Sequence, residues 1–118
     1  MVFTTDIPDW TYVETLGCDE GKRRCRWDPL PEDVAAMYEA SPVRHLENFG
    51  NSPILFLIGE RDLRVPMSSV MSFISALSAR GVATKTFRFP LDCHPLSRPQ
   101  TEYTCAVEAV EWIRKYAS

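Results

Sequence analysis

The spacing of apolar residues changes several times along this chain, and each change predicts a different element. Five consecutive apolar residues, 54–58, run into Gly59 without alternating with polar ones. Such a run predicts a strand over 53–59 that is buried on both faces, as in a parallel sheet covered by helices. Residues 82–89 are rich in β-branched and aromatic side chains and predict a second strand. Lys85 and Arg88 make this strand more polar, as expected near a sheet edge.

Apolar residues at helical intervals are found before, between and after these two strands. Apolar residues at intervals of three and four predict a helix from Pro66 to about Arg80, with Gly81 placed to end it. A shorter helix is expected to open at Pro31 and to stop at Ser41, because the residue before a proline disfavours helical geometry. One further turn is expected over 43–48.

A last helix is predicted to run to about Tyr116. Ser97 and Gln100 have the spacing of a capping box at its start. Its apolar residues fall on one face, and they are Tyr103, Ala106, Val107, Val110 and Ile113.

The order strand, helix, strand describes a βαβ unit, which places the fold in the α/β class with a parallel sheet. At 118 residues the chain makes one domain at most. We expect residues 1–48 to be irregular with short helices, and residues 49–118 to form strand, helix, strand and helix.

Composition excludes several classes of function. A net charge of −3 provides no broad basic face, so nucleic acid is not an expected partner. No apolar run reaches the length of a bilayer span, so we expect no membrane association. The first residues lack a basic region followed by an apolar core, so we expect no secretory signal and a cytoplasmic protein.

The four cysteines do not form a metal-binding pattern. Cys18, Cys25, Cys93 and Cys105 contain no C-x-x-C pair, and only Cys93 has a histidine beside it. We therefore interpret them as free thiols and expect neither a metal nor a cofactor.

Two residues at the ends of the predicted strands carry candidate chemistry. Asp62 follows the first strand and His94 follows the second. Because parallel neighbouring strands end at the same edge of a sheet, we expect the two side chains to meet. A carboxylate that holds an imidazole in one tautomer is the acid–histidine half of a hydrolase triad, and the α/β-hydrolases place the acid before the histidine along the chain.

The residues around both positions resemble the prolyl oligopeptidase family of serine peptidases. The stretch G-E-R-D-L-R-V-P over 59–66 resembles the acid loop of that family, and D-C-H-P-L-S over 92–97 resembles its histidine loop. The segments at 5–10, 41–44 and 109–113 look like the acylaminoacyl-peptidase branch in particular. The resemblance extends over nearly the whole chain.

This resemblance implies a role for three residues. Asp62 would be the triad acid, His94 the general base and acid, and Arg64 an arginine that helps to bind the substrate backbone. Pro95 departs from the family, in which a small residue is common after the histidine. The implied substrates are short N-acylated peptides, from whose ends that branch releases acylated residues.

The nucleophile of the family is missing from the pattern. It sits on a G-x-S-x-G turn between a strand and a helix, and no pair of glycines in this chain frames a serine. Gly17 and Gly21 frame Asp19, but the neighbouring residues suit neither a buried strand nor a helix start. We therefore expect the C-terminal portion of an α/β-hydrolase fold, three-layered and incomplete, with residues 1–118 forming part of a peptidase catalytic domain that is inactive alone.

Other interpretations stay open at this point. The chain is alternatively a non-catalytic degenerate fragment or a partner-binding module, and an association with a full-length relative is left open. A different α/β-hydrolase, such as an esterase, is a further alternative. In a last alternative, Asp62 is simply a turn aspartate and His94 a loop histidine.

Overall fold

The computed structural model describes residues 30–117, and it divides the chain into two compact units, Met1–Phe49 and Gly50–Ser118. The irregular N-terminal segment predicted from the sequence, with the Gly17–Gly21 spacing and with Cys18 and Cys25, lies outside the described residues.

The described part of the first unit is helical. Helix α2 (Pro31–Glu39) begins with its proline at the first position, and η2 (Pro42–Phe49) follows it. Ser41 separates them and donates a hydrogen bond from its hydroxyl to the carbonyl of Met37 at 2.8 Å. The predicted helix that opens at Pro31 and stops at Ser41 is confirmed.

The second unit contains the predicted βαβ arrangement and a final helix. Its elements are β1 (Ile54–Gly59), α3 (Met67–Ala79), β2 (Thr84–Phe89) and α4 (Pro99–Tyr116). β1 and β2 are parallel neighbours, in register from Ile54 opposite Thr84 to Gly59 opposite Phe89. No helix in the described part of the chain is long and apolar enough to cross a bilayer.

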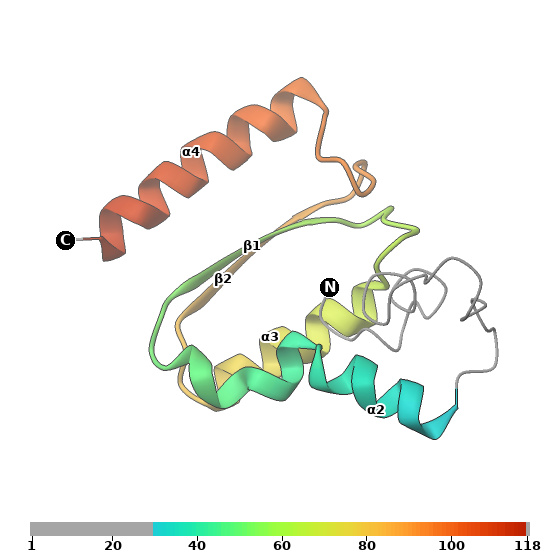
Figure 1. Cartoon of the computed structure of the whole chain (residues 1–118). Coiled ribbons are helices and arrows are strands. Elements are labelled where there is room, and N and C mark those ends of the chain that lie inside the picture. Colours follow the sequence, from blue (N-terminus) through green and yellow to red (C-terminus); the bar gives the residue numbers. More distant parts are fainter. Residues whose placement is uncertain (1–29, 118) are drawn as a thin grey trace, which may run out of the picture. The chain divides into compact units, whose positions relative to one another are not determined.

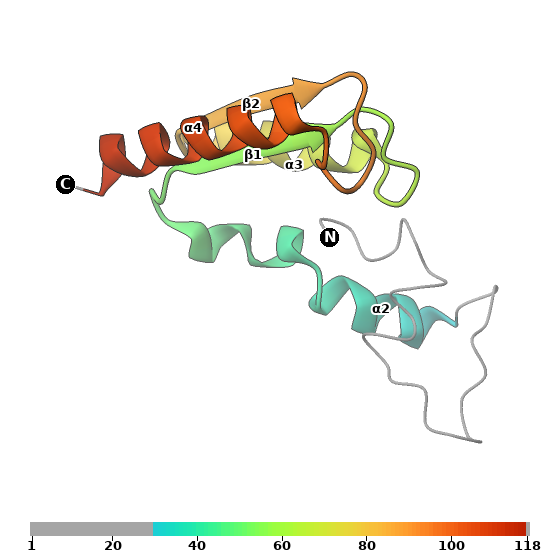
Figure 2. The same ribbon diagram turned by 90° about the horizontal axis from the view of Figure 1, so that it is seen from above.

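The two helices of this unit lie on opposite faces of the small sheet, as Figures 1 and 2 show from two directions. α3 supplies most of the core through Phe73, Ile74 and Leu77. Phe73 meets Phe56 of β1 edge to face, with their ring centroids 6.3 Å apart. α4 follows β2 in the chain but also packs against β1.

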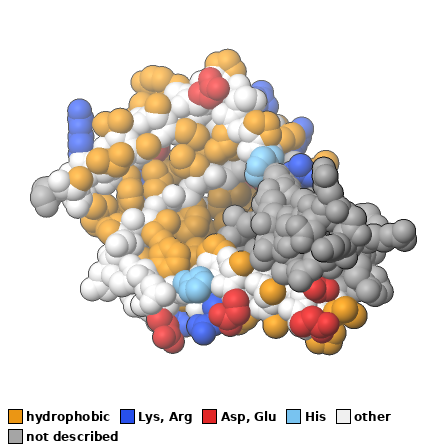
Figure 3. Space-filling model, in the orientation of Figure 1, with side chains coloured by type: hydrophobic (Ala, Val, Ile, Leu, Met, Phe, Trp, Pro, Cys, Tyr) orange, Lys and Arg blue, Asp and Glu red, His pale blue; other side chains and the backbone are white. Residues whose placement is uncertain are grey.

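The prediction that β1 is buried on both faces along its length is wrong. Only Ile58 and Gly59 are buried, and the four residues before them are half-buried. The reason is that β1 pairs with β2 alone among the described strands, so its other edge is unpaired. Hydrophobic side chains accordingly gather at the surface along α4 and the neighbouring sheet (Figure 3).

The predicted capping box at Ser97 is also wrong. The residue that caps α4 is Arg98, which is extended at φ −74° and ψ 134° and makes no capping hydrogen bond with its side chain. Pro99 forces the residue before it out of helical geometry, which moves the helix start by one residue. The third helical residue is therefore Thr101, where the capping box required Gln100.

Candidate active site

Asp62 and His94 lie at the same edge of the sheet and are hydrogen-bonded to each other. β1 and β2 end in register at Gly59 and Phe89, and each leads into a loop. We call residues 60–66 the acid loop and residues 90–98 the histidine loop. Nδ1 of His94 lies 2.8 Å from Oδ2 of Asp62, so the structure brings together the two side chains that the sequence predicted to meet.

The second carboxylate oxygen of Asp62 is held by the backbone of its own loop. Oδ1 accepts hydrogen bonds from the N–H groups of Arg64 at 2.7 Å and Val65 at 3.0 Å. Aspartate commonly closes a turn in this way, by bonding to the backbone two or three residues ahead. Because these two N–H groups hold Oδ1, the carboxylate is oriented with Oδ2 toward the imidazole of His94.

Hydrogen bonding keeps Asp62 ionised. Partial burial raises the pKa of Asp62, but the hydrogen bonds from His94, Val65 and Arg64 outweigh it, and the pKa falls below its ordinary value. Its side chain is 16% exposed, against 52% for His94. The arrangement is therefore a sheltered carboxylate beneath a more accessible imidazole.

The geometry of His94 suits a general base. When a neutral imidazole donates from Nδ1 to a carboxylate, Nε2 carries the lone pair. Nε2 of His94 has no hydrogen-bond partner among residues 30–117, and the ring faces solvent. The pair can accept a proton at Nε2 and stabilise the imidazolium that results.

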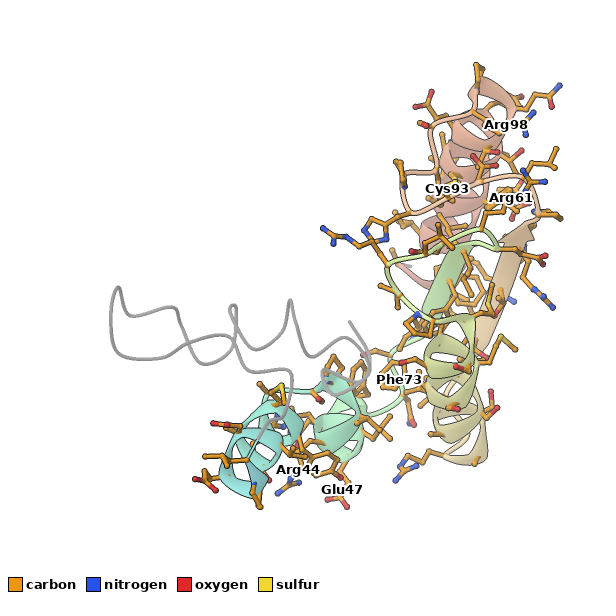
Figure 4. The ribbon with its side chains drawn as sticks, turned by 90° about the vertical axis from the view of Figure 1, so that its right-hand side faces the viewer. Arg44, Glu47, Arg61, Phe73, Cys93 and Arg98 are labelled. Carbon is orange, nitrogen blue, oxygen red and sulfur yellow. The ribbon has the colours of Figure 1, made fainter. Side chains whose placement is uncertain are left out.

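The two loops are also joined through their backbones. The N–H of Glu60 donates to the carbonyl of Phe89 at 3.0 Å, and the N–H of Arg61 donates to the carbonyl of Asp92 at 2.9 Å. Arg61 and Cys93 accordingly lie beside each other at one end of the sheet (Figure 4). These bonds continue the pairing of the two strands into the loops that carry Asp62 and His94.

Gly59 allows the histidine loop to approach β1 closely. A Cβ at this position would lie 2.8 Å from the carbonyl oxygen of Asp92 and closer still to that of Cys93. In the sequence, Gly59 marks only the end of a predicted strand. The signal for its role was a glycine placed directly before the acid loop.

Arg64 contributes to the site through its backbone. Its N–H is one of the two donors that fix Oδ1 of Asp62. The residue is exposed. Its predicted contact with a substrate backbone stays a prediction.

A family model and the similar known proteins both point to one family. A family model described as the prolyl oligopeptidase family matches residues 8–118. The acylamino-acid-releasing enzyme of Arabidopsis thaliana is 40% identical over 116 residues, which are 98% of this chain and 15% of that protein.

More distant relatives carry related names. The acylamino-acid-releasing enzyme of Homo sapiens is 33% identical over 118 residues, covering 98% of this chain and 15% of the human protein. Dipeptidyl-peptidase 4 of Giardia intestinalis is 31% identical over 85 residues, covering 71% of this chain and 11% of that protein. The chain therefore spans about a seventh of the length of its acylamino-acid-releasing relatives.

Proposed function

The chain belongs to the prolyl oligopeptidase family, and on that premise we propose that it supplies the acid and the base of a serine-type hydrolase active site. The observation that carries the proposal is the hydrogen bond of 2.8 Å between Nδ1 of His94 and Oδ2 of Asp62. The resemblance of the sequence around both residues to the acid and histidine loops of the family supports the same assignment.

The chemistry follows from the arrangement of the pair. His94 takes the proton of an attacking hydroxyl at Nε2 and later gives it to the leaving group. Asp62 holds the imidazole in the tautomer that leaves Nε2 unprotonated, and its charge stabilises the imidazolium. The nucleophile and the donors that bind the oxyanion come from outside these 118 residues.

The substrates proposed are short peptides with an acylated N-terminus. The support is the name of the plant and mammalian relatives, acylamino-acid-releasing enzyme. Arg64, exposed and two residues from the acid, is the residue proposed to bind the substrate backbone. In this account the chain is one part of an α/β-hydrolase catalytic domain, works in the cytoplasm and needs no metal or cofactor.

An assay of the chain alone tests the assignment of roles. Purified chain is treated with a fluorophosphonate probe, which labels activated serines, and is offered an acetylated amino-acid anilide. We expect neither labelling nor turnover, because an acid–base pair without its nucleophile forms no acyl-enzyme. Labelling or turnover by the wild-type chain would contradict the claim that the nucleophile comes from outside it, and a signal that survives in an Asp62→Asn variant would also contradict the role of the acid.

A second candidate function is association with a full-length relative without catalysis. A groove of about 360 Å³ on α4 favours it, lined by Tyr103, Ala106, Val107, Val110, Glu111 and Arg114. Exposed apolar surface of this kind commonly marks a contact. This candidate would be favoured if the wild-type chain and its His94→Ala variant both co-purified with the full-length relative.

A further inference from the structure

A buried carboxylate lies beside the candidate active site and is not part of it. Asp92, two residues before His94, is only 3% exposed. Burying a carboxylate is costly unless hydrogen bonds replace its water. Only one of its oxygens has a partner in the described part of the chain, since Oδ1 is buried without one.

The partnered oxygen joins the histidine loop to α4. Oδ2 accepts a hydrogen bond from the hydroxyl of Thr101 at 2.7 Å, and Thr101 is itself buried. Thr101 lies in the first turn of α4, where the positive end of the helix dipole favours a negative charge. Burial, and then the charge of Asp92, raise the pKa of the Cys105 thiol, which lies one turn further along α4.

The backbone of Asp92 joins the same loop to two further segments. Its N–H donates to the carbonyl of Phe89 at the end of β2, at 3.2 Å, and its carbonyl accepts from Arg61 of the acid loop, at 2.9 Å. The residue after it, Cys93, places its carbonyl against Gly59. Asp92, two residues before His94, is thus held by β2, by the acid loop and by α4.

We propose that Asp92 is a positioning residue for the acid–histidine pair, in which its carboxylate anchors the histidine loop to Thr101 so that His94 stays against Asp62. The inference rests on the proposed function, since it assigns Asp92 a role through that pair. A position that only needed filling would be better served by an apolar side chain than by a carboxylate with one unpaired oxygen. The carboxylate instead fixes the loop at a defined point of α4.

The test is a carbon-13 NMR titration of the Asp62 carboxyl in the full 118-residue chain. The hydrogen bond from His94 helps to lower the pKa of Asp62, so this pKa reports whether the pair is formed. Asp92→Ala and Thr101→Val each remove one side of the anchor, and both are expected to shift the pKa of Asp62 upward, toward its ordinary value. Asp92→Asn keeps an oxygen that accepts from Thr101 and is expected to restore the wild-type titration.

Glu102→Gln is the matched control, because it removes an exposed carboxylate from the same turn of α4. It is expected to leave the titration of Asp62 unchanged. Circular dichroism shows which variants are folded, and if Asp92→Ala is not, the comparison of Thr101→Val with Glu102→Gln decides.

His94→Ala separates failure of this inference from failure of the proposed function. If His94→Ala raises the pKa of Asp62 while both anchor variants leave it at the wild-type value, Asp92 does not position the pair and the inference is overturned alone. If His94→Ala also leaves it unchanged, the acid–histidine pair itself is refuted, and the proposed function and the inference fail together.

Discussion

At the scale of single residues, the site depends on the different hydrogen-bond donors that the two carboxylate oxygens of Asp62 accept from. One oxygen is bound by two backbone N–H groups of its own loop, and the other by His94. The carboxylate therefore keeps its orientation without help from the imidazole. This explains how an acid can hold a histidine whose ring is half exposed to solvent.

The lowered pKa of Asp62 predicts a pH dependence of stability. A carboxyl whose folded pKa lies below its unfolded value of about 3.9 contributes stability above that value and loses it as the pH falls through the folded pKa. The free energy of unfolding should therefore drop more between pH 5 and pH 2 in the wild type than in Asp62→Asn. The difference should be about 1 kcal/mol or less, because solvent screens the exposed His94.

Urea denaturation at a series of pH values measures this difference. Glu111→Gln, which removes an exposed carboxylate from α4, corrects for the loss of one charge. A steeper loss of stability at low pH in Asp62→Asn than in the wild type would show that the hydrogen bonds of Asp62 do not favour its ionised form.

At the scale of elements, the site exists because two parallel strands end in register and their loops remain paired beyond the strands. Gly59 is the position at which the histidine loop comes closest to β1. A side chain there must displace the backbone carbonyls of Asp92 and Cys93, which cannot move without moving His94.

Gly59→Ala should therefore separate the acid–histidine pair. We expect a loss of about 2–3 kcal/mol in the free energy of unfolding, typical of overpacking, and a rise in the pKa of Asp62. Gly81→Ala is the matched control, since Gly81 has φ +78° and open space around it. It should cost about 1 kcal/mol through backbone strain alone and leave the titration of Asp62 unchanged. Equal effects of both variants on that titration would refute the role of Gly59.

The sequence predicted the elements well where periodicity and prolines define them. The βαβ order, the helix that stops at Ser41 and the meeting of Asp62 with His94 follow from strand ends and from spacing.

The start of α4 was misplaced because Pro99 acts on Arg98 more strongly than Ser97 acts as a cap. The role of Asp92 was missed because a buried carboxylate and a solvated loop aspartate look identical in a sequence.

At the scale of the whole molecule, apolar surface is left without cover in the described residues. The side chains of Tyr103, Val110 and Ile113 on α4 are 72%, 47% and 60% exposed. β1 has an unpaired edge among the described strands. The burial that β1 was expected to have on both faces is therefore incomplete, which fits a chain that spans about a seventh of its relatives' length.

This uncovered surface predicts self-association of the isolated chain. Replacing Val110 and Ile113 together by Gln should shift the chain toward the monomer in sedimentation velocity. The free energy of unfolding should change by only about 0.5 kcal/mol, because both side chains are exposed and Gln favours helices. Leu63→Gln is the control, since Leu63 is fully exposed on the acid loop, away from α4. A monomeric wild type at the same concentrations would contradict the prediction.

The central claim, that His94 is the base of a hydrolase site, is tested most directly by kcat in a chimera. This chain replaces the aligned segment of the acylamino-acid-releasing enzyme of Arabidopsis thaliana, and turnover of an acetylated amino-acid anilide is measured. The chain contains two histidines, so His45→Ala serves as the matched control. We predict that His94→Ala lowers kcat by roughly three orders of magnitude or more while His45→Ala leaves it near that of the parent chimera. A near-normal kcat in His94→Ala would contradict the account.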